Sequence, residues 1–410
     1  MDARFAIVSL TLMCFRNYEH LSLSFTPESV VFTGANGAGK TNLLEALSYL
    51  RVGRGLRGCE GDDVVHRRSP TQTKTLTPPY HKSVDLCGVF ADVREPQGAT
   101  RRSVEWRLEP PPPQSDTTDT AMQWRKSTRR EGALDTHDDS LPMLWLVPGA
   151  DRYSADSRAK RQLFFDQLIS AQDKEHRRRL TRYDKTMRER TKVLRHHQGS
   201  WQERWLVTLE ERMAQEALAI AAARKMFIAS LNGALDAYSA TDVQAHTHVQ
   251  GTIEDQLDSF PALHVEESFC QQLKDNRRLD ALKGRAEVGV HRSRFTVSDK
   301  RRGLDAQLCS TGQQKMLTLL VVLAGASLLG RKRAAPPIVL LDEVAAHLDS
   351  RHAQQFFQLL HGSQCQAWMT GLAPELFAAS GPHIQGFDIE DGCVYPWKQP
   401  RQRSIRIAKA

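Results

Sequence analysis

One octapeptide constrains the fold of this chain more than any other feature. Gly34-Ala35-Asn36-Gly37-Ala38-Gly39-Lys40-Thr41 matches the pattern G-x-x-x-x-G-K-[ST], between a predicted strand and a predicted helix. In such a loop the glycines let backbone N–H groups turn toward phosphate, and the helix presents its positive N-terminal end. We expect Lys40 to reach the β- and γ-phosphates of ATP and the Thr41 hydroxyl to ligate Mg²⁺. The alternative is a glycine turn that caps an ordinary helix.

A second motif lies about 300 residues further along the chain. Ile338-Val339-Leu340-Leu341 is typical of a buried parallel strand, and it ends in Asp342 and Glu343. An acid at the carboxyl end of such a strand lies where phosphates bind in open α/β folds. We expect Asp342 to bind the nucleotide through Mg²⁺ and Glu343 to polarise the attacking water as the catalytic residue. Alone, a hydrophobic strand ending in acids is commonplace; together with the octapeptide it predicts nucleotide hydrolysis.

A third motif opens a predicted apolar helix at residues 312–330. Ser310 is a favourable N-cap, so plain helix capping is one interpretation. The other is the signature motif of ABC-type ATPases, an S-x-G-Q core that precedes a helix and contacts the γ-phosphate bound to the opposite subunit. In that interpretation Ser310, Gly312 and Gln313 make the contact. Asp349, just after the acidic strand, is then the candidate D-loop residue.

Composition limits the class of protein. The chain has 410 residues, of which 40% are apolar and 25% charged, so a disordered, collagenous or small disulfide-stapled protein is excluded. Seven scattered cysteines without a C-x-x-C pair indicate reduced thiols and a cytoplasmic location. The apolar run at 316–330 is shorter than the roughly 20 residues of a membrane span, and we expect none. A net charge of +8 favours a polyanionic partner, with nucleic acid first.

The predicted elements suggest an α/β protein interrupted by a helical block. From Arg158 to Leu235 glycine and proline nearly vanish, charges crowd the surface and apolar residues keep a helical period. Strand signals return near Phe295. We therefore predict an ABC-type P-loop ATPase head with an inserted helical arm domain. The expected parts are an N-terminal lobe at 1–145 with a flexible insertion at 110–142, the arm at 146–280, and a C-terminal lobe at 281–410.

With these motifs in order, the chain resembles the RecF family, bacterial recombination mediators of the ABC/SMC/Rad50 class. The resemblance spans nearly the whole chain. Its matching stretches are Phe15-Arg16-Asn17-Tyr18, the octapeptide continued to Ala46, residues 53–58, Arg158 to Arg161 with Phe165-Asp166, His291-Arg292-Ser293, Ser310 to Lys315, and Leu340 to Asp349.

The resemblance implies a function in recombinational DNA repair, the SOS response to DNA damage and replication restart. Its implied cofactors are ATP and Mg²⁺, and its implied partners are single- and double-stranded DNA. ATP would close two copies head-to-tail into a homodimer that binds DNA at single-strand gaps and helps recombinase loading. A RecR-like mediator is a further implied partner. ATP hydrolysis would be weak, DNA-dependent and used as a switch.

Three other classes of protein fit these motifs less well. The nucleotide-binding subunit of a transporter would need a Gln near residues 147–150 and a switch His where Gly371 stands, and slow hydrolysis is expected without them. A chromosome-organising protein of the SMC type would need hundreds of heptad residues between the motifs. A small-molecule kinase is disfavoured by Ser310–Gln313 and by the long gap to Asp342.

Candidate DNA contacts are basic runs. Residues 171–197 hold ten Lys/Arg against four Asp/Glu, and the tail at 398–409 has five basic residues and no acid. Such runs contact phosphate without reading bases, although a solvated helix face and a frayed tail are the alternative. The candidates are Arg177, Arg178 and Arg179 in the arm and Arg54, Arg57, Arg67 and Arg68 beside the ATPase face.

Overall fold

The computed structural model describes residues 4–51, 53, 55–58, 63–65, 86–109, 123–131, 140–146, 149, 158–196 and 203–397. They form two compact units, each built from segments distant in the sequence. We call them the helical unit (residues 1–5, 142–339 and 347–365) and the sheet unit (residues 6–141, 340–346 and 366–410). This division differs from the three expected segments, because the helix that Ser310 opens packs with the arm helices.

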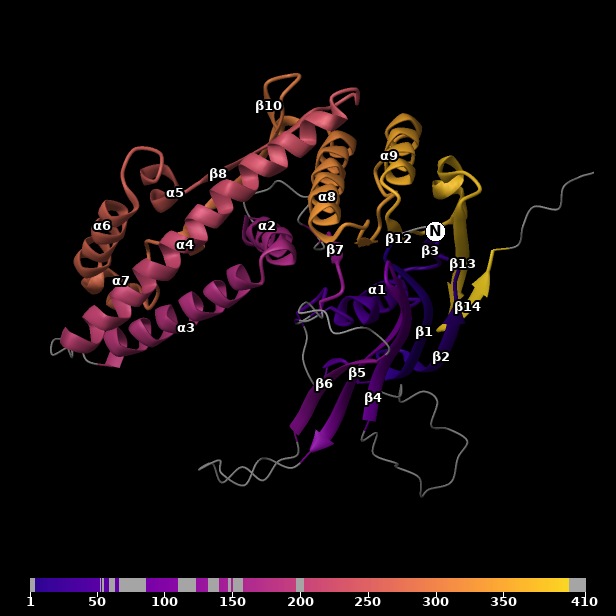
Figure 1. Ribbon diagram of the computed structural model, residues 1–410, viewed down its shortest axis with the longest axis horizontal. Helices are drawn as coiled ribbons and strands as arrows, with labels where there is room; N and C mark the ends of the chain where they lie inside the picture. Colours follow the sequence, from indigo (N-terminus) through magenta and orange to yellow (C-terminus); the bar gives the residue numbers. More distant parts are fainter. Residues whose placement is uncertain are drawn as a thin grey trace, which may run out of the picture. The chain divides into compact units, whose positions relative to one another are not determined.

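Among the described residues of the sheet unit, five strands form an antiparallel sheet in the order β2-β1-β4-β5-β6 (Figure 1). Their bounds are β1 (Ala6–Phe15), β2 (Tyr18–Ser24), β4 (Leu86–Glu95), β5 (Gly98–Glu109) and β6 (Gln123–Glu131). The N-terminal ribbon expected from residue alternation is confirmed, with Leu12 opposite Leu21. Phe15 and Trp106 of this sheet pack against Tyr49 of α1 (Lys40–Tyr49), which fixes the helix that follows the glycine-rich loop.

Strand β6 lies inside the segment 110–142 that the sequence suggested as a flexible insertion. It pairs with β5 from Glu109 opposite Gln123 to Arg101 opposite Glu131. The prediction is therefore wrong for residues 123–131, while 110–122 and 132–139 lie outside the described residues. Charged, exposed side chains are what an edge strand of a sheet carries, so a polar composition did not indicate a loop here.

The second sheet of this unit holds the central strand β3. Within this unit its strands are, in order, β14 (Cys393–Pro396), β13 (Ile384–Glu390), β3 (Ser29–Thr33), β12 (Gln366–Thr370) and β11 (Ile338–Leu341). β3 lies between β12 and β13 and runs parallel to both. Phe32 packs against Trp368 and Phe387 of the two neighbouring strands. The loop after β3 is thus anchored by a buried strand whose Phe32 packs against aromatic rings of both neighbours. A short 3₁₀ helix, η7 (Pro374–Ser380), follows β12.

The helical unit is built around two long helices. The helices of this unit are α2 (Arg158–Gln172), α3 (Lys174–His196), α4 (Glu203–Leu235), α5 (Thr252–Gln256), α6 (Ala262–Asp275), α7 (Arg277–Lys283), α8 (Thr311–Arg333) and α9 (Ser350–Gly362). Helices α3 and α4 run side by side, α6 packs on α4, α7 packs on α3, and α8 packs on the other part of α4 (Figure 1). The predicted helical block and apolar helix are confirmed.

Short strands and 3₁₀ turns complete the helical unit. They are β7 (Met143–Trp145), η4 (Asp236–Tyr238), β8 (Ala245–Gln250), η5 (Val290–Arg292), β9 (Arg294–Asp299), β10 (Leu304–Asp305) and η6 (Ala306–Leu308). β8 lies within the segment expected to be a helical arm, and it pairs with β9 across the predicted boundary at 280. Its alternating buried and exposed residues match a half-buried strand.

Two described helical stretches, Glu203–Tyr238 and Thr311–Arg333, are long and apolar enough by length and composition to cross a bilayer. However, 44% and 72% of their apolar windows are buried in the structure. Such burial is typical of core helices in a folded domain.

A fully buried arginine joins three segments of the helical unit. Arg224 of α4 donates to both carboxylate oxygens of Asp166 at 3.0 and 2.8 Å, to Glu254 at 3.2 Å and to the carbonyl of Val290 at 2.7 Å. Ser293 donates to Glu254 at 2.7 Å. Asp166 and Ser293 belong to two of the stretches that carried the family resemblance, so these stretches serve the core of this unit.

Candidate nucleotide site

The glycine-rich loop connects the end of β3 to the first turn of α1. Gly34 and Gly39 adopt φ angles of +139° and +113°, which L side chains rarely reach. A Cβ on Gly34 would collide with the carbonyl oxygen of Ile389, and one on Gly39 would collide with the side chains of Asn17 and Tyr18. Glycine is therefore required at both positions for backbone conformation and for space.

Lys40 is folded back over this loop. Its ammonium donates to the carbonyl of Gly34 at 2.7 Å and to that of Ala35 at 2.8 Å, and only 5% of the residue is exposed. The loop thus encloses a buried positive charge at the N-terminal end of a helix. Both features attract a phosphate group.

Two residues at the β1–β2 turn, Asn17 and Tyr18, contact the glycine-rich loop. Asn17 donates to the carbonyl of Ala38 at 3.3 Å and accepts from the Asn42 amide at 2.8 Å, so it ties the loop to α1. Tyr18 is buried next to Gly39, and burial raises the pKa of its hydroxyl. The turn itself is fixed by Arg16, which makes two hydrogen bonds to the buried carboxylate of Glu45.

The acidic end of β11 meets the loop within the sheet unit. Thr41 donates to both carboxylate oxygens of Asp342 at 3.1 Å, across 301 positions of sequence. Thr370, the last residue of β12, donates to Asp342 at 2.5 Å and accepts from the backbone N–H of Glu343 at 2.7 Å. The structure therefore brings the two predicted magnesium ligands together.

Glu343 itself is exposed and has a φ of +48°, an uncommon conformation for a residue with a side chain. Strain of this kind persists where the surrounding structure enforces it, and it is concentrated at functional sites. Here the Thr370 hydroxyl fixes the Glu343 N–H on one side, and the Ala346 N–H donates to the Glu343 carbonyl at 3.2 Å on the other.

A cavity of about 960 Å³ opens above the glycine-rich loop. Its walls are the loop residues 34–38 with Asn17, the segment 372–374 after β12, and the β13–β14 turn at 388–392. This volume suits a nucleotide-sized ligand. Loop residues 34–38 and the segments that follow β12 and β13 therefore frame a single cavity.

Comparison with known proteins identifies the family. The family model described as "AAA domain, putative AbiEii toxin, Type IV TA system" matches residues 29–371. The DNA replication and repair protein RecF of Mesorhizobium japonicum is 36% identical over 408 residues, which cover 97% of this chain and 99% of that protein. The chain belongs to the RecF family, within the AAA-domain class of that model. RecF of Rhizobium johnstonii is 32% identical over 397 residues, covering 96% of this chain and all of that protein.

Solved RecF structures share the fold. A structure of the recombination mediator protein RecF with ATPrS, in the RecFOR pathway, has a TM-score of 0.74 and 19% sequence identity. It covers 97% of this chain and 99% of that chain. The corresponding RecF–ATP structure gives the same values. The predicted family and α/β ATPase fold are thus confirmed.

The candidate signature residues lie in the helical unit, at the start of α8. Ser310 is the N-cap: its hydroxyl accepts from the Gln313 N–H at 3.4 Å, and its own N–H donates to the Gln313 side chain at 3.1 Å. This is a complete capping box. Gly312 lies so close to the carbonyl of His347 that an added Cβ would be 3.1 Å from it. Capping is therefore real, and the proposed contact with a second subunit would add to it.

Asp349, the D-loop candidate, caps α9. It accepts from the His352 N–H at 2.8 Å and pairs with the His352 ring at 2.7 Å. These hydrogen bonds, the backbone one first, lower the pKa of Asp349. A capping role does not exclude a further contact, and the D-loop assignment stays a prediction.

The candidate DNA contacts of the RecF resemblance fall into three groups. Arg54, Arg67 and Arg68 lie outside the described residues. Arg57 is committed to the sheet unit, because it pairs with Glu45 at 3.3 Å and donates to Asn42 at 3.0 Å. Arg177, Arg178 and Arg179 lie in the first turns of α3, where Arg178 pairs with Glu175 at 3.3 Å and burial lowers the pKa of Arg177.

Gly371, at the switch position of transporter ATPases, cannot accept a larger side chain in this arrangement. An added Cβ would collide with the ring of Phe377, and the Gly371 N–H donates to the carbonyl of Phe32 at 3.0 Å. A histidine at this place would require Phe377 to move. In this chain, glycine at position 371 therefore has a packing reason.

Thr370 and the bracing role of Asn17 were missed in the sequence. Asn17 is in a stretch that carried the family resemblance, but nothing there indicated that it holds the loop. Thr370 stands directly before the glycine noted at the switch position, at the end of an apolar strand. A hydroxyl at the end of the strand beside the acidic one is the signal that could have found it.

Proposed function

We propose that this chain is an ATP-dependent DNA-binding protein of recombinational repair and replication restart. The observation that carries the proposal is the hydrogen bonding of Thr41 to Asp342 beside the buried ammonium of Lys40. A hydroxyl, a carboxylate and a lysine at a helix N-terminus form the set that holds a magnesium nucleotide. Curated relatives over nearly the full chain, named DNA replication and repair protein RecF, support the biological assignment.

The residues present fit ATP with Mg²⁺. Thr41 and Asp342 would hold the ion, whose charge would neutralise the phosphates when bound. Lys40 would exchange the carbonyls of Gly34 and Ala35 for phosphate oxygens, at little cost because its ammonium is already within the loop. Backbone N–H groups of the loop would orient the phosphates.

Glu343 would act as the general base. Its exposed carboxylate would hold a water and accept its proton, while the neighbouring N–H stays bound to Thr370. Glycine rather than histidine at position 371 supports slow hydrolysis. We therefore propose a weak, DNA-dependent ATPase that works as a switch.

The assembly that this function needs is a homodimer closed by ATP. Ser310, Gly312 and Gln313 of one copy would contact the γ-phosphate held by the other, with Asp349 nearby, and a head-to-tail pair of this kind is closed by symmetry. The dimer would bind DNA at single-strand gaps in the cytoplasm. It would help recombinase loading together with a RecR-like mediator. A solved RecF structure described as belonging to the RecFOR pathway supports this partner.

Binding of the purified chain to fluorescent DNA tests the proposal. Gapped, fully duplex and single-stranded DNA of equal length are titrated with and without ATP and Mg²⁺, and anisotropy is measured. We expect ATP to strengthen binding to gapped DNA in the wild type and to have no effect on Lys40→Ala. DNA affinity that is the same with and without ATP would contradict the proposed switch.

A further inference from the structure

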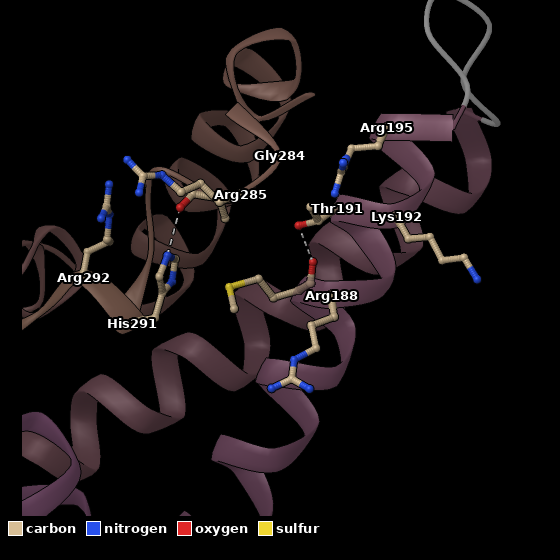
Figure 2. Close-up of a pocket in the computed structure, with 10 residues that line it drawn as sticks. Arg188, Thr191, Lys192, Arg195, Gly284, Arg285, His291 and Arg292 are labelled. Carbon is tan, nitrogen blue, oxygen red and sulfur yellow. Dashed lines mark hydrogen bonds between the residues drawn. The ribbon is translucent and has the colours of Figure 1, made fainter. Parts of the chain in front are cut away.

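The helical unit has a basic cavity of about 600 Å³ that is separate from the nucleotide site. It lies between the second half of α3 and the segment that follows α7 (Figure 2). Five cations line it, and none of its lining residues, all of which the structure describes, is an Asp or Glu. The cations are Arg188, Lys192, Arg195, Arg285 and Arg292.

One wall is a single face of α3. Arg188, Lys192 and Arg195 are spaced four and three residues apart, which places them on one stripe of the helix. The rotation of α3 is set from the inside, because fully buried Arg190 pairs with Asp280 of α7 at 2.6 Å. The basic stripe is therefore held in place by a buried ion pair.

The other wall comes from a segment about 90 residues further along the chain. α7 ends at Gly284, whose φ of +64° turns the chain back toward α3. Arg285 and Arg292 follow on this wall, and Arg195 extends from α3 toward Gly284 (Figure 2). A Cβ at Gly284 would lie 3.6 Å from the Arg195 side chain, so the two walls are in close contact here.

The positive charge of the cavity is only partly neutralised. Glu287 accepts hydrogen bonds from Lys283, Arg285 and Arg292, and these bonds, that of Lys283 first, lower the pKa of Glu287 to about 2. One carboxylate is thus shared by three cations.

On the α3 wall, Arg188 pairs with Asp184 at 2.7 Å. For Lys192 and Arg195, no acidic group lies within ion-pair distance among the residues that the structure describes. The cavity therefore presents a net positive charge from both walls.

The rest of the cavity carries no charge and no aromatic platform. His291 is the ring that lines it, and both ring nitrogens are engaged, with the Tyr183 hydroxyl and the Ala286 carbonyl at 3.0 Å each. Burial lowers the pKa of His291, which disfavours its charged form. No Phe, Tyr or Trp is among the described lining residues. Unstacked bases of a single strand are bound chiefly by aromatic stacking, and this cavity offers none.

We propose that this cavity is a second anion site, which holds backbone phosphates of duplex DNA. The inference rests on the DNA binding proposed above and names where on the helical unit it occurs. Cations from two walls can contact one strand from both sides. Contacts with backbone phosphates do not read bases, so this contact is independent of sequence. The residues differ from Arg177, Arg178 and Arg179, which lie two to five turns earlier on α3.

The test compares two double variants that remove equal charge. Lys192→Gln with Arg195→Gln removes the two cations without an acidic partner, so no carboxylate is left unpaired. Arg212→Gln with Lys274→Gln is the matched control, because both residues are exposed on α4 and α6 and neither lines the cavity. Equal unfolding midpoints by circular dichroism establish that both variants are folded.

Affinity for duplex DNA is measured as a function of salt concentration. The cavity variant should bind roughly tenfold more weakly, and the slope of log K against log salt should fall by about 0.9 for each lost phosphate contact. The control and the charge-keeping variant Lys192→Arg with Arg195→Lys should match the wild type. Single-stranded DNA should show no difference between the cavity variant and the control.

Several outcomes would overturn the inference. An equal loss of duplex affinity in the cavity variant and the control would mean that overall charge, and not the cavity, binds the DNA. Unchanged duplex affinity in the cavity variant would indicate that the cavity binds an acidic protein partner instead. If excess dTMP abolishes the difference in duplex affinity between the wild type and the cavity variant, the cavity binds a free nucleotide instead. A wild-type chain that binds no DNA at all would instead refute the proposed function itself.

Discussion

The Thr370 hydroxyl donates to Asp342 Oδ1 at 2.5 Å, and Thr370 Oγ1 accepts from the backbone N–H of Glu343 at 2.7 Å. One side chain at the end of β12 thus sets both acidic residues at the end of the neighbouring β11. Asp342 is oriented toward Thr41, and the strained backbone of Glu343 is satisfied. Thr370 acts through these residues as a positioning residue.

Replacing Thr370 with Val should slow ATP hydrolysis at least tenfold. The variant keeps the shape of the side chain but leaves the Glu343 N–H without its acceptor, at a cost of about 1–3 kcal/mol. The steady-state kcat should fall more than the ATP affinity changes, because Lys40 and the loop are untouched. Thr370→Ser keeps the hydroxyl and should retain most of the turnover; equal loss in both variants would contradict the hydrogen-bonding role.

Lys40→Ala should abolish tight ATP binding, since the β- and γ-phosphates lose the one buried ammonium of the described loop. Titration with a fluorescent ATP analogue measures the dissociation constant, which should rise by two orders of magnitude or more, at roughly 1.4 kcal/mol per tenfold change. Lys40→Arg serves as a charge control. Wild-type affinity in the alanine variant would refute the assignment of the loop.

Glu343→Gln should keep ATP binding and slow hydrolysis about a hundredfold, because general-base catalysis typically contributes 10²–10⁴ in rate. Asp342 and Thr41 remain to hold the ion. The ATP-bound dimer should accumulate and be visible by size-exclusion chromatography with light scattering. Unchanged turnover would show that another group activates the water.

Ser310→Arg should separate ATP binding from dimerisation. Ser310 is exposed at the start of α8, in a unit different from that of the glycine-rich loop, so the monomer should still bind ATP. A bulky cation there would block closure against the partner's nucleotide, and ATP-dependent dimerisation and DNA retention should fail. Ser310→Thr keeps the cap and should behave like the wild type.

Mixing Ser310→Arg with Lys40→Ala subunits tests whether the sites are shared. In a head-to-tail dimer, one site pairs an intact loop with an intact signature motif and the other carries both lesions. Dimerisation and hydrolysis should partly recover on mixing. If Ser310→Arg dimerises on ATP by itself like the wild type, Ser310 is an N-cap alone.

The stability of the helical unit should depend on pH through Asp166. Burial alone would raise the pKa of this carboxyl, but the charge of Arg224 outweighs it and holds the pKa below its ordinary value of 3.8. A carboxyl whose pKa is lower in the folded state than in the unfolded state stabilises the fold. This contribution is complete at pH values above the unfolded-state pKa, and it is lost as the pH falls through the folded-state pKa. Asp166→Asn should cost about 3–5 kcal/mol near pH 7, because Arg224 then loses one of its two buried carboxylate partners.

Urea unfolding between about pH 7 and pH 3 measures this dependence. The wild type should lose stability as pH falls below about 4, and Asp166→Asn should lose less over the same interval. Glu267→Gln, at an exposed position on α6, is the control and should follow the wild type. Parallel curves for the wild type and Asp166→Asn would contradict the stabilising role of the ionised carboxylate.

Much of the nucleotide site could be predicted from the sequence because each part has a local signature. The glycines, Lys40 and Thr41 are fixed by the geometry of one loop, and the apolar run before Asp342 fixes a strand end. Thr41 and Asp342 come together because the strands that precede them, β3 and β11, belong to one sheet. Thr370 and Asn17 could not be found in this way, since their roles depend on which strand and turn become neighbours.

The division of the chain and the edge strand were harder to predict for a related reason. Residues 123–131 are polar because they form a sheet edge, which composition alone does not distinguish from a loop. The helix that Ser310 opens joins the arm helices through packing on α4, a contact between segments about 100 residues apart. The role of a basic residue on α3 depends on the helix face on which it lies. Arg190 forms a buried ion pair, whereas Lys192 and Arg195 line the cavity.

The position of β3 in its sheet has a consequence for synthesis of the chain. β3 is made within the first 33 residues, but both of its hydrogen-bonded neighbours, β12 and β13, come from residues 366–390. On the ribosome, the glycine-rich loop therefore emerges long before the strands that anchor it. A nascent chain that ends before residue 366 has Lys40 but no assembled site. ATP binding can therefore stabilise only those molecules whose translation has passed β13.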